Sequence, residues 1–235
     1  MIGIFADSFG YQFVKEAPSW PNYLGKHYKE EVENFSLFAT AINYSYERFI
    51  HKMDTDPNRY SKIVFVCTEP HRQTFKDNNR KQEIAYAGRN AKETVRFNRE
   101  CTEIKPHFMQ QDITKNEEEA IKGYHIWDSM FPNTFEYVRD AVERVVKSYP
   151  NTLVLHTEQL SKITELDMGS PADFVKYSEK SERSCHMSAI QNKELSEYIV
   201  KYFEEDFNIH DVFKDVNKYF TKSNTIQEAG LILNE

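Results

Sequence analysis

Glycine and clustered basic residues are both scarce in this sequence, and each shortage excludes a class of protein. Only 7 of the 235 residues are glycine, so Gly-rich phosphate loops, collagen-like repeats and flexible linkers are not expected. The net charge is −7 and no long run of Lys or Arg occurs. Because neutralising phosphates requires clustered cations, a nucleic-acid partner is disfavoured. P-loop and Rossmann fingerprints are absent as well, so we expect no nucleotide chemistry and no cofactor.

Cysteines are few and long apolar runs are missing. The three cysteines, Cys67, Cys101 and Cys185, are widely spaced and fit neither a disulfide framework nor a CxxC metal site. The histidines lack a metal-ligand spacing such as HExxH. No stretch approaches the ~18 consecutive apolar residues of a membrane span, and the residues before Asp7 lack the basic region of a signal peptide. We therefore predict a soluble protein of the producing cell's cytoplasm, with no membrane partner and no metal.

The residues that are present favour one globular domain of α/β type. Hydrophobic residues make up 40% of the chain and aromatic residues 14%, enough to fill a substantial core. Apolar runs typical of buried parallel strands alternate with segments of helical period, such as those at 135–146 and 187–207. In the second of these, Ser188 and Gln191 form a capping-box pattern. The strand-like runs lie at residues 2–6, 62–68 and 152–156, with a weaker one at 31–37. Such alternation predicts a three-layer α/β/α sandwich around a central parallel sheet.

Two segments depart from this alternation. Residues 75–127 are polar and charge-rich, and we predict a helical insertion there, either a solvated excursion or a lid or partner-binding element. The main domain is then expected to span residues 1–207. Residues 208–235 form a C-terminal tail, with a short helix and a loose end that docks on the domain or on another chain.

A serine and a histidine stand at positions suited to nucleophilic catalysis. Ser8 follows the first strand directly and precedes a segment that can be helical, where its hydroxyl is exposed and backbone N–H groups can stabilise an oxyanion. His186 lies in a loop just before the last long helix, from which it can reach Ser8 and act as its general base. The alternatives are structural: Ser8 is only the N-cap of the first helix, and His186 is a surface or cap histidine.

Three short motifs resemble the blocks of the SGNH (GDSL-type) hydrolases. ADSFG at 6–10 resembles the family's Gly-Asp-Ser block, NFSLFA at 34–39 its Asn-x-Gly-x-x-Gly block, and CHMS at 185–188 the block that carries the base. VEN, TEPHR and RSCHMS are similar to elements of the divergent bacteriophage members of that family. The resemblance implies a flavodoxin-like sandwich, with Ser8 as the nucleophile and His186 as the base. It also assigns Asp7, Asn34 and Ala39 to the nucleophile and oxyanion blocks.

The motifs also depart from the family pattern. Ala6 and Ala39 replace two glycines, and a backbone N–H at Ala39 remains a plausible oxyanion donor. Pro70 stands where the oxyanion Asn belongs and has no donor, so Thr68, His71 or Arg72 would have to substitute for it.

The position that the triad's acid usually occupies in this family is Arg183 here. Glu182 is our candidate for orienting His186, Asp173 is a weaker one, and a Ser–His dyad without an acid is the remaining alternative.

Two functions fit these residues. The first is a serine ester hydrolase acting on an ester or an acylated carbohydrate, such as an O-acetyl group of a polysaccharide. The second is a non-catalytic relative, a virion-associated structural or carbohydrate-binding protein of a phage, with virion or homo-oligomer contacts. Ser8 and His186 favour the enzyme, whereas Ala6, Ala39, Pro70 and Arg183 favour the non-catalytic protein.

Overall fold

The computed structural model describes most of the chain outside the predicted insertion. It describes residues 1–11, 18–37, 40–68, 134–166 and 187–222, the isolated positions 119, 123 and 130, and the backbone of 72–77, 82–87 and 94–98.

Four parallel strands form the central sheet. They are β1 (Ile2–Phe5), β2 (Val32–Asn34), β3 (Lys62–Cys67) and β7 (Thr152–His156), in the order β2-β1-β3-β7. β1 pairs in parallel with both β2 and β3, so the direction of strand succession reverses between β1 and β3. This order is that of flavodoxin-like sheets, in which ligands bind at the carboxyl ends of the strands beside the reversal.

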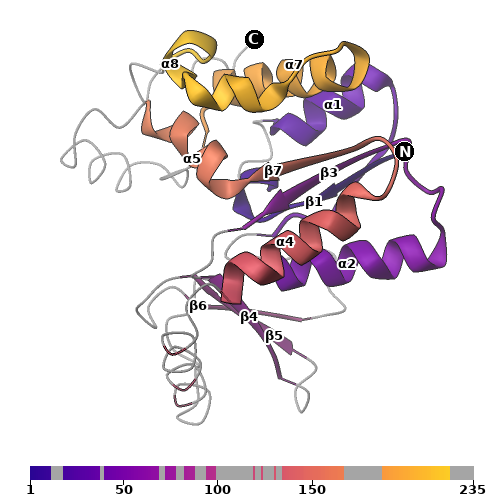
Figure 1. Ribbon diagram of the computed structural model, residues 1–235, viewed down its shortest axis with the longest axis vertical. Coiled ribbons are helices and arrows are strands. Elements are labelled where there is room, and N and C mark those ends of the chain that lie inside the picture. Colours follow the sequence, from indigo (N-terminus) through magenta and orange to yellow (C-terminus); the bar gives the residue numbers. More distant parts are fainter. Residues whose placement is uncertain are drawn as a thin grey trace.

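Helices cover both faces of the sheet, which confirms the predicted three-layer architecture (Figure 1). One face carries α1 (Trp20–Tyr28), α5 (Thr157–Glu165) and α7 (Ala189–Glu204), and the other carries α2 (Ile42–Thr55) and α4 (Thr134–Lys147). Successive strand residues point to opposite faces. Val64 and Val66 therefore pack with Leu195 and Ile199 of α7, while Phe65 packs with Phe49 of α2.

The expected start of the last long helix is confirmed. Ser188 is the N-cap of α7, its hydroxyl accepts from Gln191 N at 3.3 Å, and Gln191 Oε1 accepts from Ser188 N at 2.9 Å. This reciprocal pair satisfies two backbone donors that a helix start leaves open, so the loop that ends at Ser188 enters the helix in a defined orientation.

The prediction of a helical insertion at 75–127 is wrong where the structure describes strands between residues 75 and 98. β4 (Arg72–Asp77), β5 (Gln82–Ala87) and β6 (Thr94–Asn98) form a second, antiparallel sheet in the order β4-β5-β6. Pairing places Phe75 opposite Ile84 and Tyr86 opposite Thr94, residue types that favour strands when a partner strand lies beside them. The charged residues between them suggested a helix, because strand pairing is not visible in local composition. Of the remainder of the predicted insertion, Glu119 and Gly123 are helical, and the other positions from 99 to 127 lie outside the described residues.

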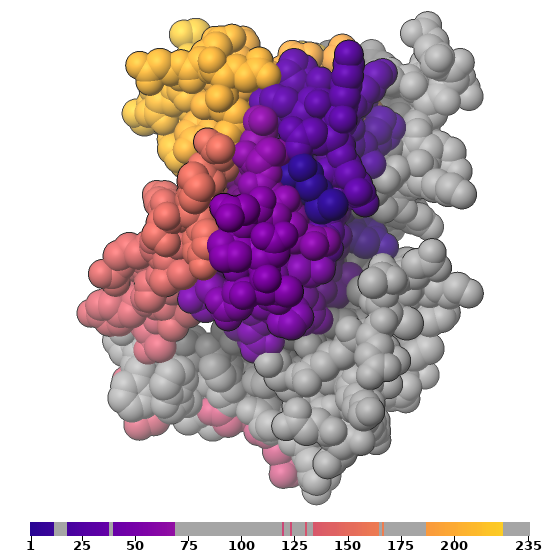
Figure 2. Space-filling view, turned by 90° about the vertical axis from the view of Figure 1, so that its right-hand side faces the viewer, coloured from indigo at the N-terminus to yellow at the C-terminus, as the bar shows by residue number. Residues whose placement is uncertain are grey.

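The segment after residue 207, expected to be a tail that docks on the domain or on another chain, packs on the domain over the part that the structure describes. After α7 the chain forms a short 3₁₀ helix η3 (Ile209–Lys214) and α8 (Val216–Tyr219). Ile209, Val212, Phe213 and Phe220 are at most 5% exposed and belong to the core on the α7 face of the sheet. η3 contacts α5 and α7, and α7 in turn packs on α1; Figure 2 shows α7 and the segment after it, in orange and yellow, beside the violet N-terminal part of the chain. Residues 209–220 are therefore part of the domain, and those beyond 222 lie outside the described residues.

Every helix that the structure describes is too short or too polar to cross a bilayer.

Glu33 of β2 is an acidic side chain held by three hydrogen bonds. Its carboxylate accepts hydrogen bonds from Lys52 Nζ at 2.7 Å, Arg59 Nε at 2.7 Å and the Tyr60 hydroxyl at 2.6 Å. Burial alone would raise the pKa of Glu33, but these three bonds outweigh it and lower the pKa from 4.5 to about 2. Its ionised form therefore contributes stability that is fully present above pH 4.5 and is lost as the pH falls toward 2.

We expect Glu33→Gln to lower the free energy of unfolding at pH 7 by about 2 kcal/mol, because three donors lose a charged acceptor. The deficit should shrink as the pH falls from 4.5 toward 2, where wild-type Glu33 becomes protonated. Urea denaturation from pH 7 to pH 3 measures this, with the exposed Glu31→Gln as a matched control. Identical pH profiles for Glu33→Gln and wild type would contradict the expectation.

Candidate functional site

Ser8 lies at the carboxyl end of β1, beside the strand reversal between β1 and β3. It is the first residue of a short 3₁₀ helix η1 (Ser8–Gly10) and is 5% exposed. Asp7, not Ser8, is the N-cap of η1: its Oδ1 accepts from Phe9 N at 3.0 Å. The interpretation of Ser8 as a simple capping residue therefore does not hold.

The loop after β2 holds the other end of η1. Asn34 Nδ2 donates to the Gly10 carbonyl at 2.9 Å, and Asn34 Oδ1 accepts from Ser36 N at 2.9 Å. Ser36 packs so closely on Gly10 that a Cβ added there would lie 3.0 Å from Ser36 Cβ and nearer still to Ser36 Oγ. The predicted binding residue Asn34 thus lies at the site, where it fixes the turn that carries Ser8.

Thr68 follows β3 at the same edge of the sheet. It is fully buried, and its hydroxyl has no hydrogen-bond partner among the described residues. The preceding carbonyl, that of Cys67, accepts from Thr157 Oγ1 at 3.1 Å, and the same hydroxyl lies 3.3 Å from Asp7 Oδ2. The ends of β1 and β3 are therefore joined one residue before Ser8 and Thr68.

A chain of hydrogen bonds connects η1 with the start of α7. Trp20 Nε1 donates to the Phe9 carbonyl at 2.7 Å, and Trp20 N donates to Asn192 Oδ1 at 3.1 Å. Asn192 Nδ2 in turn donates to the Met187 carbonyl at 3.0 Å. Met187 is 3% exposed and lies in the same core cluster as Ala6 and Phe9. Residue 187, the sequence neighbour of His186, is thus connected to the turn that carries Ser8 by three hydrogen bonds, through Trp20 and Asn192.

The other predicted site residues fall on less completely described parts of the chain. His186, Glu182 and Ala39 lie outside the described residues, as do Asp173, Arg183, Pro70 and His71. Arg72 is the first residue of β4, where its backbone lies opposite Ala87.

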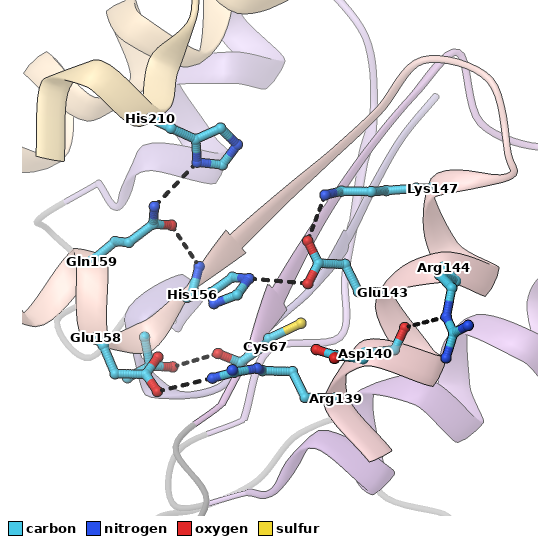
Figure 3. A network of polar contacts seen from close by, with 11 residues as sticks. Cys67, Arg139, Asp140, Glu143, Arg144, Lys147, His156, Glu158, Gln159 and His210 are labelled. Atoms are coloured by element: carbon cyan, nitrogen blue, oxygen red, sulfur yellow. Dashed lines mark hydrogen bonds and ion pairs between the residues drawn. The ribbon is translucent and has the colours of Figure 1, made fainter. Parts of the chain in front are cut away.

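A second group of polar residues lies at the carboxyl ends of β3 and β7 (Figure 3). His156 Nε2 lies 3.4 Å from Glu143 Oε2, and the same carboxylate pairs with Lys147. Burial would raise the pKa of Glu143, but the bond from Lys147 and the charge of His156 lower it overall.

Gln159 links this group to the C-terminal segment. Its Oε1 accepts from His156 N at 3.0 Å, which turns its amide nitrogen toward His210 Nδ1 at 3.1 Å. This contact is a hydrogen bond to His210 Nδ1 in the tautomer that carries its proton on Nε2. Burial first, and then the charges of Lys147 and His156, lower the pKa of His210.

Cys67 is buried beneath this group, and burial, reinforced by Glu143, raises the pKa of its thiol to about 12. At neutral pH it is a protonated thiol and therefore no nucleophile. Within the described parts of the chain, no three His, Cys, Asp or Glu side chains converge as metal ligands.

Thr157 is the site residue that sequence reasoning missed. The rule that singled out Ser8, a polar residue directly after a buried strand, applies equally to Thr157, which follows the strand-like run 152–156. What the rule does not reveal is that its side chain reaches Asp7, which is 150 residues away.

Comparison of this chain with models of protein families, with curated proteins and with solved structures yields no match.

Proposed function

We propose that this protein is a serine ester hydrolase in which Ser8 is the nucleophile and His186 the general base. The observation that carries the proposal is the chain of bonds from Phe9 through Trp20 and Asn192 to Met187. It holds the residue after Ser8 and the residue after His186 in one bonded unit, although they are distant in sequence. The placement of Ser8 beside the strand reversal supports it independently.

In the proposed reaction, His186 removes the proton from Ser8 Oγ as that oxygen attacks the ester carbonyl. Backbone N–H groups at Ser8 and Ala39 stabilise the oxyanion, and Glu182 orients His186. Collapse of the intermediate gives an acyl-Ser8 and the alcohol, which takes the proton from His186. Water, deprotonated by the same histidine, then releases the carboxylic acid and restores Ser8.

The Thr68 hydroxyl is a further oxyanion donor in this proposal. Pro70 has no N–H to offer, whereas Thr68 is buried beside the reversal with a hydroxyl that no described residue engages. Loss of one standard oxyanion donor lowers rates by about 10²–10³-fold. We therefore expect slow turnover of generic esters.

The proposed substrate is a short acyl ester, such as an O-acetyl group on a carbohydrate. With Ser8 only 5% exposed, a small acyl group reaches its hydroxyl more readily than a long chain does. Nucleic acid and membrane partners have no role in this proposal.

The test is covalent labelling of the purified protein with a fluorophosphonate, alongside hydrolysis of a short-chain chromogenic ester. We expect slow hydrolysis and a single phosphonylated peptide that contains Ser8, identified by mass spectrometry. An unlabelled protein without hydrolytic activity would overturn the proposal in favour of the non-catalytic, virion or carbohydrate-binding alternative.

A further inference from the structure

Thr157 joins the carboxyl ends of three strands through one hydroxyl. It follows β7 as the first residue of α5 and is fully buried. Its Oγ1 lies 3.3 Å from Asp7 Oδ2, after β1, and 3.1 Å from the carbonyl of Cys67, the last residue of β3. The Thr157 hydroxyl therefore connects the end of β7 with the end of β1, which lies on the other side of β3 in the sheet.

The hydrogen bonds of the Thr157 hydroxyl are not part of the capping of α5. The residue before it, His156, is the N-cap of α5, and the His156 N–H is satisfied by Gln159 Oε1 at 3.0 Å. The Thr157 side chain instead bonds outside its own helix, to groups 150 and 90 residues away.

One Asp7 carboxylate oxygen contacts the turn that carries Ser8, and the other contacts Thr157. Oδ1 accepts from Phe9 N at 3.0 Å and so defines the start of η1, while Oδ2, at 3.3 Å, shares the Thr157 hydroxyl with the Cys67 carbonyl at 3.1 Å. A hydroxyl has a single proton, and a carboxylate is a stronger acceptor than a carbonyl. Thr157 is therefore one of the groups that orient the Asp7 carboxylate, and through it the start of η1.

We propose that Thr157 is a positioning residue for Ser8, acting through Asp7. This inference rests on the proposed function and extends it to a residue that neither reacts nor touches the substrate. Nucleophilic attack requires the serine oxygen in a narrow range of positions. Thr157 restricts that range by holding the carboxylate that caps the turn.

The experiment compares Thr157→Val with Thr157→Ser. Valine keeps the shape of threonine and removes the hydroxyl, whereas serine keeps the hydroxyl. For Thr157→Val we expect kcat to fall about tenfold with KM unchanged, because the transition state is more sensitive to the position of Ser8 than binding is. Thr157→Ser should restore most of kcat.

Thr164→Val is the matched control. Thr164 is also a buried threonine of α5, 5% exposed, but its hydroxyl donates within the helix to the Ser161 carbonyl at 2.7 Å. We expect the Thr164→Val variant to change the melting temperature by an amount similar to Thr157→Val, and to leave kcat near the wild-type value. Equal kcat losses in the two valine variants, or no recovery in Thr157→Ser, would overturn the proposal.

Amide hydrogen exchange of the Phe9 N–H separates this proposal from the proposed function. We expect Thr157→Val, but not Thr157→Ser or Thr164→Val, to accelerate exchange there, because a loosened Asp7 carboxylate protects that N–H less well. If the wild-type protein neither hydrolyses esters nor reacts with the fluorophosphonate, the proposed hydrolase function is refuted. Faster exchange of the Phe9 N–H in Thr157→Val would still support the role of Thr157 in orienting the turn that carries Ser8. If the exchange of the Phe9 N–H is the same in Thr157→Val as in wild type, the positioning role of Thr157 is refuted, whether or not the protein is an active hydrolase.

Discussion

Replacing Ser8 by alanine is expected to lower the rate of ester hydrolysis by about 10³-fold or more. The reason is chemical: without Oγ no acyl-enzyme forms, and the remaining N–H donors only assist attack by water. Ser8 is almost buried and alanine is smaller, so the fold should accommodate the change. The measurement is kcat/KM on a short-chain chromogenic ester, with the melting temperature recorded for each variant.

Ser36→Ala is the matched control for this variant. Ser36 is likewise buried, at 8% exposure, and lies against the same turn, but its hydroxyl has no partner among the described residues. Removing an unpaired buried hydroxyl is close to neutral for stability, and the proposed reaction does not use it. A Ser8→Ala protein as active as Ser36→Ala would exclude Ser8 as the nucleophile.

The second large effect is expected from Gly10→Ala. A Cβ at this position would lie 2.9 Å from Ala6 Cβ and 3.0 Å from Ser36 Cβ, and closer still to Ser36 Oγ. The first two neighbours sit on a buried strand end and a bonded loop, so the turn must move instead. Overpacking of this kind destabilises proteins by about 1–3 kcal/mol. We expect a loss at the upper end of that range, together with loss of ester hydrolysis, because the movement displaces Ser8.

Chemical denaturation and the ester assay measure the two parts of this effect. Gly123→Ala is the control, since a Cβ at Gly123 meets nothing within 4 Å and alanine is favoured over glycine in a helix. Adding Ser36→Gly to Gly10→Ala should recover part of the stability by removing the closest atoms. If Gly10→Ala is as stable and active as Gly123→Ala, the conclusion that η1 packs too closely on Ser36 to admit a Cβ at residue 10 is contradicted.

The secondary structure of the main sheet could be predicted because its signals are local. A buried parallel strand is a continuous apolar run, and the runs at 2–6, 62–68 and 152–156 became β1, β3 and β7 with boundaries that differ by one residue or less. The capping pair Ser188 and Gln191 lies three residues apart and acts through its own backbone, so it too was visible in the sequence.

The strands of residues 72–98 could not be predicted in the same way. They are short, their charged residues suggest a solvated helix, and their stability comes from pairing with one another. Similarly, the sequence left open whether the C-terminal segment docks on the domain or on another chain, because Ile209 and Val212 occur among polar residues. Only the apolar face of the domain shows that they have a place to be buried.

For the candidate site, the sequence by itself determined which residue ends the first strand, and therefore that Ser8 lies at the carboxyl edge of a parallel sheet. That follows from local periodicity, which needs no distant partner. The tertiary structure decided how the site is held together. Asp7 caps the turn in place of Ser8, Trp20 and Asn192 join it to the start of α7, and Thr157 fixes Asp7 from across β3. Each of these contacts joins groups brought together only when the strands take their order in the sheet, and that order is set by packing over the whole domain.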